Sequence, residues 1–118
     1  MINGDGNYSR DFTYIDNVIQ ANFLSLITTN KNAINHVYNV AYGERNTLND
    51  LIYYLKEYLS DYDPKISDIK VIYGPKREGD IPHSHACIDK AKNRLNYNPD
   101  FSLKKGLQEA IKWYWKTL

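Results

Sequence analysis

Two loops of the sequence each carry an arginine where an anion could bind. Arg10 follows the turn-rich segment 3–6, with the sequence NGDG, whose residues tolerate positive φ. Arg77 lies in the loop 76–80, with the sequence KREGD, near the other end of the chain. Guanidinium groups bind phosphate through paired, charge-assisted hydrogen bonds. We therefore expect the two arginines to hold one diphosphate between them.

Two further polar residues follow Arg77 in the second loop. Asp80 stands three residues after Arg77, and its carboxylate could accept hydrogen bonds from vicinal ribose hydroxyls. Ser84 could donate to a sugar or phosphate oxygen. The alternative interpretation is that the arginines are surface residues paired with Asp11 and Glu78, and that Asp80 caps the loop.

The sequence also contains patterns that a metal site or a hydride-transfer enzyme could use. His83, His85 and Cys87 alternate and would share one face of an extended segment, but zinc usually takes four ligands and no fourth has suggestive spacing. Ordinary loop packing is the alternative. None of the eleven tyrosines has a lysine four residues later, so the Tyr-x-x-x-Lys pair of many hydride-transfer enzymes is absent. We expect no metal and no catalytic residue.

The apolar patterning predicts helices and short strands in alternation. A sheet of two or three short strands under three or four helices is not a self-sufficient doubly wound fold, and no Gly-x-Gly-x-x-Gly follows a strand. We therefore expect a small, incomplete α/β domain. We expect strands at 10–15, 36–41 and 69–73. We also expect a helix at 89–95 and three further helices, whose N-caps are Asp16, Thr47 and Ser102.

The packing of these elements can also be predicted. The inner stripe of the first helix is expected to comprise Val18, Ile19, Asn22, Phe23, Leu26 and Ile27. Gly106 inside the last helix costs about 1 kcal/mol against alanine, which a close approach of another backbone would explain. The loop 76–86 has few apolar anchors, so a bound ligand could hold it in place.

Composition excludes several classes of function. The net charge is +1, which argues against bulk binding to nucleic acid or to a membrane surface. No run approaches the roughly 18 apolar residues of a membrane span. Cys87 is the sole cysteine, so no internal disulfide can form, which fits a reducing cytoplasm.

Four segments in order resemble one protein family. INGDG with SRDFTYIDNVIQAN, then VYNVAYGERNTLNDL, KREGDIPHSHACIDKAKNRLNYNP and FSLKKGLQEAIKWY are similar to the C-terminal part of extended short-chain dehydrogenase/reductases. Within the NAD-dependent epimerase/dehydratases, the likeness is to bacterial UDP-N-acetylglucosamine 4-epimerases. The resemblance covers essentially the whole chain and implies a role in polysaccharide biosynthesis.

The resemblance implies roles for particular residues. Arg10 and Arg77 would be the diphosphate ligands, Asp80 the ribose or nucleotide contact, and Ser84 a lesser contact. Ile2 and Asn3 would present backbone and amide groups to the substrate. The family usually has arginine-proline-glycine-aspartate in the second loop, whereas this chain has Glu78 in place of the proline.

The resemblance also implies that the chain, residues 1–118, is a single nucleotide-sugar-binding domain of a larger enzyme. In such enzymes a Rossmann domain precedes this part, binds NAD and carries the catalytic groups, and the parent is a homodimer. We expect the chain alone to lack epimerase activity and tight NAD binding, and to self-associate through the surface that the absent domain would cover. Alternatives are the same role in another nucleotide-sugar epimerase, dehydratase or decarboxylase, or a non-catalytic nucleotide-sugar- or partner-binding module.

Overall fold

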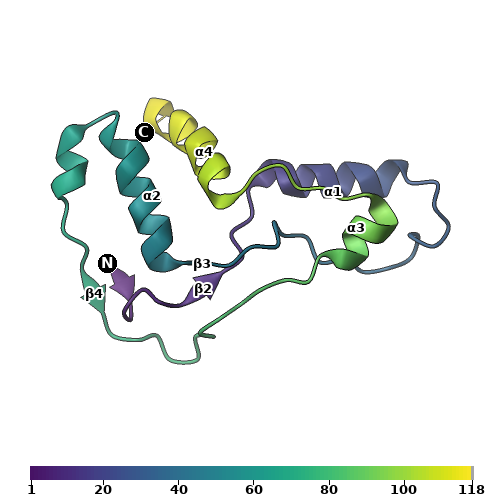
Figure 1. The fold of residues 1–118 in the computed structure, drawn as a ribbon, viewed down its shortest axis with the longest axis horizontal. Coiled ribbons are helices and arrows are strands. Elements are labelled where there is room, and N and C mark those ends of the chain that lie inside the picture. The colour runs from purple at the N-terminus through teal and green to yellow at the C-terminus, as the bar shows by residue number, and fades with distance from the viewer. Residues whose placement is uncertain (118) are drawn as a thin grey trace.

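The structure is a computed structural model that describes residues 1–117. Four α-helices and four very short strands make up the regular structure of these residues (Figure 1). The α-helices are α1 (Ile15–Ile27), α2 (Leu48–Ser60), α3 (Asp89–Leu95) and α4 (Leu103–Thr117). The strands are β1 (Ile2–Asn3), β2 (Ser9–Arg10), β3 (Asn46–Thr47) and β4 (Tyr73–Gly74), with the 3-10 helix η1 (Pro64–Asp68) between α2 and β4. The expected small, incomplete α/β domain is confirmed.

The strands form two separate two-stranded pairs. β1 runs parallel to β4, with Ile2 opposite Tyr73, and β2 runs antiparallel to β3, with Arg10 opposite Asn46. Each strand has two residues, whereas the patterning predicts longer strands at 10–15 and 69–73. The predicted strand at 36–41 is absent as a paired strand. The strand pairs therefore tie distant loops together and do not form the floor of a core.

Helix α1 differs from its prediction in its start and in its packed face. It begins at Ile15, Tyr14 at the N-cap makes no side-chain capping bond, and Asp16 lies in the first turn. The predicted inner stripe is wrong, because its large apolar members Ile19, Phe23, Leu26 and Ile27 are exposed and Asn22 is exposed as well. The residues of α1 that are buried are Asn17 and Ala21.

The buried asparagine of α1 is Asn17, whereas the sequence predicted that Asn22 would lie on the inner face. Its side chain is 1% exposed. The amide nitrogen donates to the Phe101 carbonyl at 2.8 Å, and the amide oxygen accepts from the backbone N–H groups of Asp100 and Phe101, each at 3.1 Å. All three bonds satisfy the polar groups of the buried amide. Asn17 thus fixes the start of α1 against the segment that leads into α4.

Helix α2 begins as the sequence predicts. The Thr47 hydroxyl accepts from the Asp50 backbone N–H at 3.0 Å, and the Asp50 carboxylate accepts from the Thr47 N–H at 2.8 Å, which completes a capping box. These bonds hold the Asp50 carboxylate ionised and lower its pKa. Because Thr47 also belongs to β3, which pairs with β2, the cap links α2 to the strand that carries Arg10.

The core consists mostly of small residues and lies at one end of the molecule. It includes Ala21 on α1, Ala91 on α3, Ala41, Ile88 and Tyr97. Tyr97 is 1% exposed and its hydroxyl donates to the Ala41 carbonyl at 2.8 Å. A core of this size buries little apolar surface for each residue of the chain.

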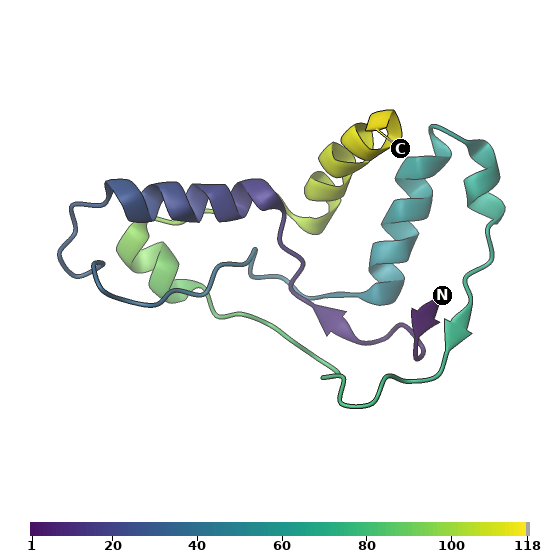
Figure 2. The same ribbon diagram turned by 180° about the vertical axis from the view of Figure 1, so that it is seen from behind.

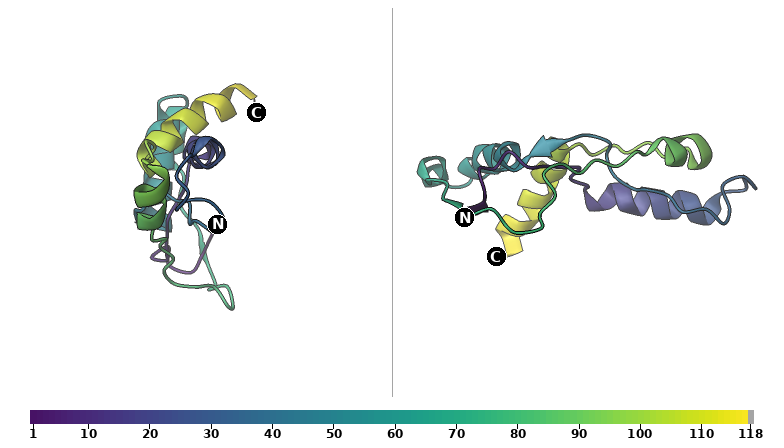
Figure 3. Two further views of the ribbon diagram at one scale, coloured as in Figure 1. Left: turned by 90° about the vertical axis from the view of Figure 1, so that its right-hand side faces the viewer. Right: turned by 90° about the horizontal axis from the view of Figure 1, so that it is seen from below.

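The molecule is flat. Its principal extents are 53 × 35 × 19 Å. The front and back views place α1 and α3 toward one end, and α2, α4 and the strands toward the other (Figures 1 and 2). The edge-on views show that the helices form little more than one layer (Figure 3). Among residues 1–117, no helix is both long enough and apolar enough to cross a membrane.

Candidate anion-binding site

A polar pocket of about 410 Å³ brings the two predicted arginines together. Its lining residues come from β2 and from the loop between β4 and α3. They are Arg10, Arg77, Glu78, Gly79, Asp80, Ile81 and Ser84. Four of the six residues predicted to bind a nucleotide sugar, namely Arg10, Arg77, Asp80 and Ser84, therefore line one hollow.

Arg10 is held at the pocket by three hydrogen bonds. Its Nη1 donates to the Ser9 carbonyl at 2.8 Å and to the Pro82 carbonyl at 3.5 Å. Its Nη2 donates to Asp80 Oδ1 at 2.5 Å, and this bond is also an ion pair between two partly buried side chains. The guanidinium group is therefore oriented before any ligand binds, and Asp80 occupies one of its edges.

The loop that carries Arg77 is anchored to β2 by the protein itself. The Ser9 N–H donates to the Pro82 carbonyl at 2.9 Å, and the Ser84 N–H donates to the Ser9 carbonyl at 3.0 Å. A further hydrogen bond joins Ser9 Oγ and His83 Nδ1 at 2.9 Å. A bound ligand is therefore not required to hold this loop. Sequence reasoning missed Ser9, since nothing in the sequence signals a partner 74 residues away.

Residues 77–80 form a tight turn that projects Arg77 and Asp80 from its two ends. The Asp80 N–H donates to the Arg77 carbonyl at 3.3 Å, and Gly79 has φ +75°, which a glycine adopts readily. Glu78 stands at the second position of the turn, where proline is favoured. Among residues 1–117, Arg77 forms no ion pair, so its charge faces the pocket without a carboxylate partner.

Ile2 and Asn3 lie outside this pocket. Ile2 is buried, and its N–H donates to the Ile72 carbonyl at 2.8 Å. Asn3 is exposed and pairs with Gly74 in the β1–β4 ladder. The structure thus separates these two predicted substrate contacts from the four that line the hollow.

The acidic neighbour of Arg10 points elsewhere. The Asp11 side chain is 5% exposed and lies 3.6 Å from His85 Nδ1. Its carboxylate accepts from the Gly43 N–H at 3.2 Å and from the Glu44 N–H at 3.4 Å. Arg10 and Asp11 therefore have separate partners, as the period of an extended strand predicts. The simple pairing of Arg10 with Asp11 is wrong.

The alternating His83, His85 and Cys87 bind different protein groups. His83 contacts Ser9, His85 lies beside Asp11, and Cys87 Sγ donates to Asp89 Oδ2 at 3.5 Å. Within the described part of the chain, no cluster of three or more potential ligands could hold a metal ion. The histidines instead fix the loop to β2 and to the segment that follows it.

Burial also raises the pKa of one tyrosine in the core. Burial of the phenol and then the nearby negative charge of Asp11 raise the pKa of Tyr97 to about 12. The neutral phenol donates its hydrogen bond to Ala41 at any physiological pH. The Tyr97 hydroxyl therefore serves the packing of the core.

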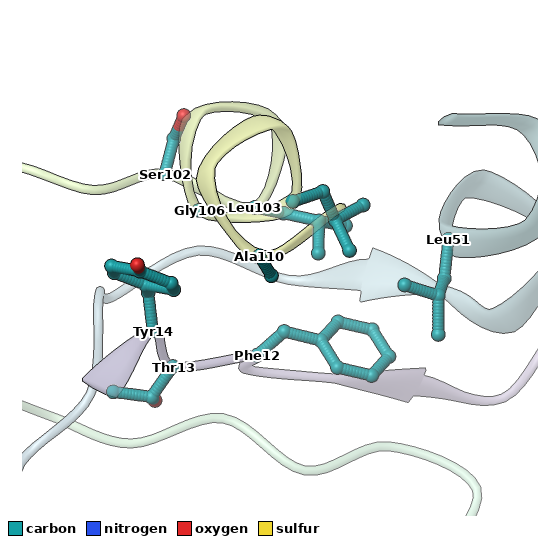
Figure 4. A pocket seen from close by; sticks show the side chains of 9 residues that line it. Phe12, Thr13, Tyr14, Leu51, Ser102, Leu103, Gly106 and Ala110 are labelled. Carbon is teal, nitrogen blue, oxygen red and sulfur yellow. The ribbon is translucent and has the colours of Figure 1, made fainter. Parts of the chain in front are cut away.

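A second hollow, of about 200 Å³, is apolar. Figure 4 shows side chains from three places converging on it: the stretch after β2, α2 and α4. Gly106 of α4 lies against Tyr14 here, since a Cβ atom at Gly106 would lie 2.8 Å from the Tyr14 Cβ. The close neighbour of Gly106 is thus a side chain and not a second backbone. The hollow offers no charged group to an anion.

The described residues do not fit a dinucleotide. The motif at 4–6 has two glycines after β1, but a turn and β2 follow it, and the next helix begins at Ile15. Residues 1–117 contain no sheet of more than two strands, whereas NAD binds at the edge of a larger parallel sheet.

The comparisons with known proteins point in one direction. No protein-family model matches the chain. UDP-glucuronate 4-epimerase 4 of Arabidopsis thaliana is 30% identical over an alignment of 119 positions, which covers 92% of this chain and 26% of that protein. UDP-glucuronate 4-epimerase of Thermodesulfobacterium geofontis is 31% identical over an alignment of 112 positions, which covers 93% of this chain and 31% of that protein. The chain thus spans about a third or less of the curated relatives it matches.

Solved structures agree with the sequence relatives. The UDP-glucose 4-epimerase of Thermotoga maritima, solved with UDP-glucose, has a TM-score of 0.83 and 36% identity over 98% of this chain and 34% of that one. The UDP-N-acetylglucosamine 4-epimerase of Methanobrevibacter ruminantium, solved with UDP-N-acetylmuramic acid, has a TM-score of 0.84 and 36% identity over 99% of this chain and 34% of that one. By sequence and by fold, the chain is a homologue of the C-terminal part of UDP-sugar 4-epimerases, which are extended short-chain dehydrogenase/reductases.

Proposed function

We propose that residues 1–118 form the substrate-binding domain of an NAD-dependent UDP-N-acetylglucosamine 4-epimerase. The observation that carries this proposal is the convergence of Arg10 and Arg77 on one pocket, with Asp80 and Ser84 beside them. A nucleotide-sugar diphosphate carries about two negative charges, which two guanidinium groups match. The domain contributes orientation of the substrate, which lowers the entropic part of a reaction barrier.

Each pocket residue has a distinct role in this proposal. Arg77, which is free of ion pairs within residues 1–117, takes one phosphate. Arg10 takes the other when its bond to Asp80 is exchanged for a phosphate oxygen. The released Asp80 carboxylate then accepts from the ribose hydroxyls, and the Ser84 hydroxyl donates to a sugar or phosphate oxygen.

Homologues solved with ligands support a UDP-sugar as the substrate class. They include the Bacillus cereus UDP-glucuronic acid 4-epimerase with UDP-glucuronic acid and NAD, besides the complexes with UDP-glucose and UDP-N-acetylmuramic acid. We assign NAD and the catalytic groups to the remainder of the parent enzyme, in the reducing cytoplasm. UDP-N-acetylglucosamine is our choice among the sugars, and UDP-glucose and UDP-glucuronic acid are the competitors to measure against it.

Titration calorimetry tests the proposal directly. The chain should bind UDP-N-acetylglucosamine, and Arg77→Ala should weaken binding by about 10- to 100-fold, as expected for a hydrogen bond to a charged group. Lys92→Ala, which removes an exposed positive charge from α3, is the matched control and should leave affinity unchanged. Absence of binding at millimolar ligand, or equal effects of the two variants, would overturn the assignment.

A further inference from the structure

The polar pocket holds as many negative as positive side chains. Of its lining residues, Arg10 and Arg77 are cationic, whereas Glu78 and Asp80 are anionic. Asp80 forms an ion pair with Arg10 and is the acceptor assigned above to the ribose hydroxyls. Glu78 is the remaining carboxylate, and the diphosphate proposal gives it no role. Because a carboxylate repels the anion that its neighbours bind, Glu78 affects which anions the pocket accepts.

Glu78 has no ionic partner in the described part of the chain. Within residues 1–117, its carboxylate forms no ion pair, although Arg77 precedes it directly in the sequence. Lys76, one residue further back, lies over the Tyr8 ring, with its Nζ 5.8 Å from the ring centroid. The negative charge of Glu78 therefore acts on a ligand in the pocket.

The backbone at this position does not require a glutamate. Residues 77–80 form a turn closed by the hydrogen bond from the Asp80 N–H to the Arg77 carbonyl, with Gly79 at φ +75° as its third residue. A positive φ at the third residue is typical of a type II turn, whose second residue is often proline. Glu78 is that second residue, and it is exposed, so it does not serve packing. What Glu78 adds to the turn is therefore its charge.

The size of the pocket sets the strength of this repulsion. A hollow of about 410 Å³ is about 9 Å across, so a charge on its wall lies about 7 Å from an anion inside. At that distance in water, Coulomb repulsion lowers affinity about threefold for each negative charge on the ligand. The effect of Glu78 therefore grows with the number of charges that the ligand carries.

Two kinds of diphosphate differ by one such charge. In a nucleotide sugar, both phosphates are bridged on two sides and carry about one negative charge each. A free nucleoside diphosphate ends in a monoester phosphate, whose second pKa is about 6, so it carries about three charges at pH 8. The free nucleoside diphosphate offers the same ribose and the same two phosphates. Contacts to these groups alone cannot exclude it from the pocket.

We propose that Glu78 is a specificity-determining residue whose charge makes the pocket favour a nucleotide sugar over the free nucleoside diphosphate. The two arginines match the two charges of a nucleotide sugar, and no further cation lines the pocket to match a third. The third charge therefore meets the repulsion from Glu78 without compensation. This inference rests on the proposed diphosphate site and adds a ligand class that the site disfavours.

Titration calorimetry with UDP-N-acetylglucosamine and with UDP tests the inference. Wild type and Glu78→Gln are compared at pH 8 and about 0.01 M ionic strength, where the Debye length is about 30 Å, without divalent cations. The variant should bind UDP-N-acetylglucosamine about sevenfold and UDP about 20-fold more tightly than wild type, because these ligands carry two and three charges. The ratio of the two gains, about threefold, isolates the additional charge, because contacts that only one ligand makes cancel.

Salt distinguishes a charge effect from a change of shape. At 0.15 M salt the Debye length is about 8 Å, and the ratio of the gains should fall below about twofold. Equal gains for the two ligands, or a ratio that salt leaves unchanged, would overturn this inference and leave the diphosphate site standing. Absence of binding by both ligands at millimolar concentration would overturn the diphosphate site and this inference together.

Two further variants serve as controls. Glu57→Gln removes the same charge from an exposed position in the second half of α2, which points away from the loop between β4 and α3 (Figures 1 and 2). It should leave the affinity for both ligands unchanged. Glu78→Pro removes the charge and suits the second position of the turn, so it should give the same ratio of gains as Glu78→Gln. A ratio of one in Glu78→Pro, or a gain from Glu57→Gln equal to that from Glu78→Gln, would overturn the inference.

Discussion

Arg10 and Asp80 are 70 residues apart in the sequence and form an ion pair at the rim of the polar pocket, with Nη2 and Oδ1 2.5 Å apart. Their side chains are 30% and 27% exposed, so solvent screens the pair and its stabilising effect is small. The pair nevertheless fills one edge of a guanidinium group that could otherwise bind phosphate. An anion that enters the pocket competes with the protein's own carboxylate.

Asp80→Asn should therefore strengthen the binding of inorganic pyrophosphate. Removing the carboxylate frees Arg10, and the release of an ion pair worth up to about 1 kcal/mol corresponds to an increase in affinity of up to about fivefold. The ratio of UDP affinity to pyrophosphate affinity should fall, because the acceptor that we propose for the ribose hydroxyls is weakened. Calorimetry with both ligands measures the two effects. Asp61→Asn, at the exposed C-cap of α2, is the charge-matched control, and an unchanged pyrophosphate affinity in Asp80→Asn would show that the pair does not restrain Arg10.

Ser9→Ala should loosen the loop that carries Arg77. The substitution removes the hydrogen bond between Ser9 Oγ and His83 Nδ1, which contributes about 0.5–1.5 kcal/mol. Exchange of the Ser84 amide, which donates to the Ser9 carbonyl, should become faster by the corresponding factor. Ser67→Ala, in the exposed η1, should leave that amide unchanged. Equal protection in Ser9→Ala and wild type would show that the backbone bonds alone hold the loop.

The capping box of α2 should make stability depend on pH in the acid range. The pKa of Asp50 is lowered in the folded state by its hydrogen bonds to Thr47. The stabilisation is therefore fully present above the unfolded pKa, about 3.9, and is lost as the pH falls through the lower folded value. Urea unfolding of wild type and Asp50→Asn should differ by about 1 kcal/mol at pH 7 and converge below about pH 3. A difference that persists unchanged at low pH would contradict this.

Gly106→Ala should destabilise the fold although alanine is the better helix former. The helix gains about 1 kcal/mol of propensity, but the added Cβ would lie 2.8 Å from the Tyr14 Cβ and 3.0 Å from its Cγ. The atoms contacted belong to the base of a side chain and cannot swing away, so overpacking of about 1–3 kcal/mol outweighs the gain. Thermal unfolding measures the net effect. Gln108→Ala, exposed on the same helix, should change stability by less than about 0.5 kcal/mol, and a stabilised Gly106→Ala would refute the close packing.

Local chemistry allowed part of the structure to be predicted from sequence. Thr47 begins α2, and α3 spans residues 89–95 as expected. Caps and short helices depend on residues three or four positions apart, which the sequence displays directly. The separate partners of Arg10 and Asp11 also have a local cause, because an extended backbone points successive side chains in opposite directions.

The tertiary structure decided which surfaces are buried and which distant groups meet. The apolar residues of α1 suggested an inner stripe, but the side that packs is the one with Asn17 and Ala21. The attachment of Ser9 to His83 and the ion pair of Arg10 with Asp80 join segments more than 65 residues apart. By itself, the sequence determined where the helices α2 and α3 start and which charges were available for a diphosphate. Only the fold determined which helix faces are buried and which distant residues pair. Burial and long-range pairing depend on two surfaces in contact, and a local sequence pattern describes only one of the two.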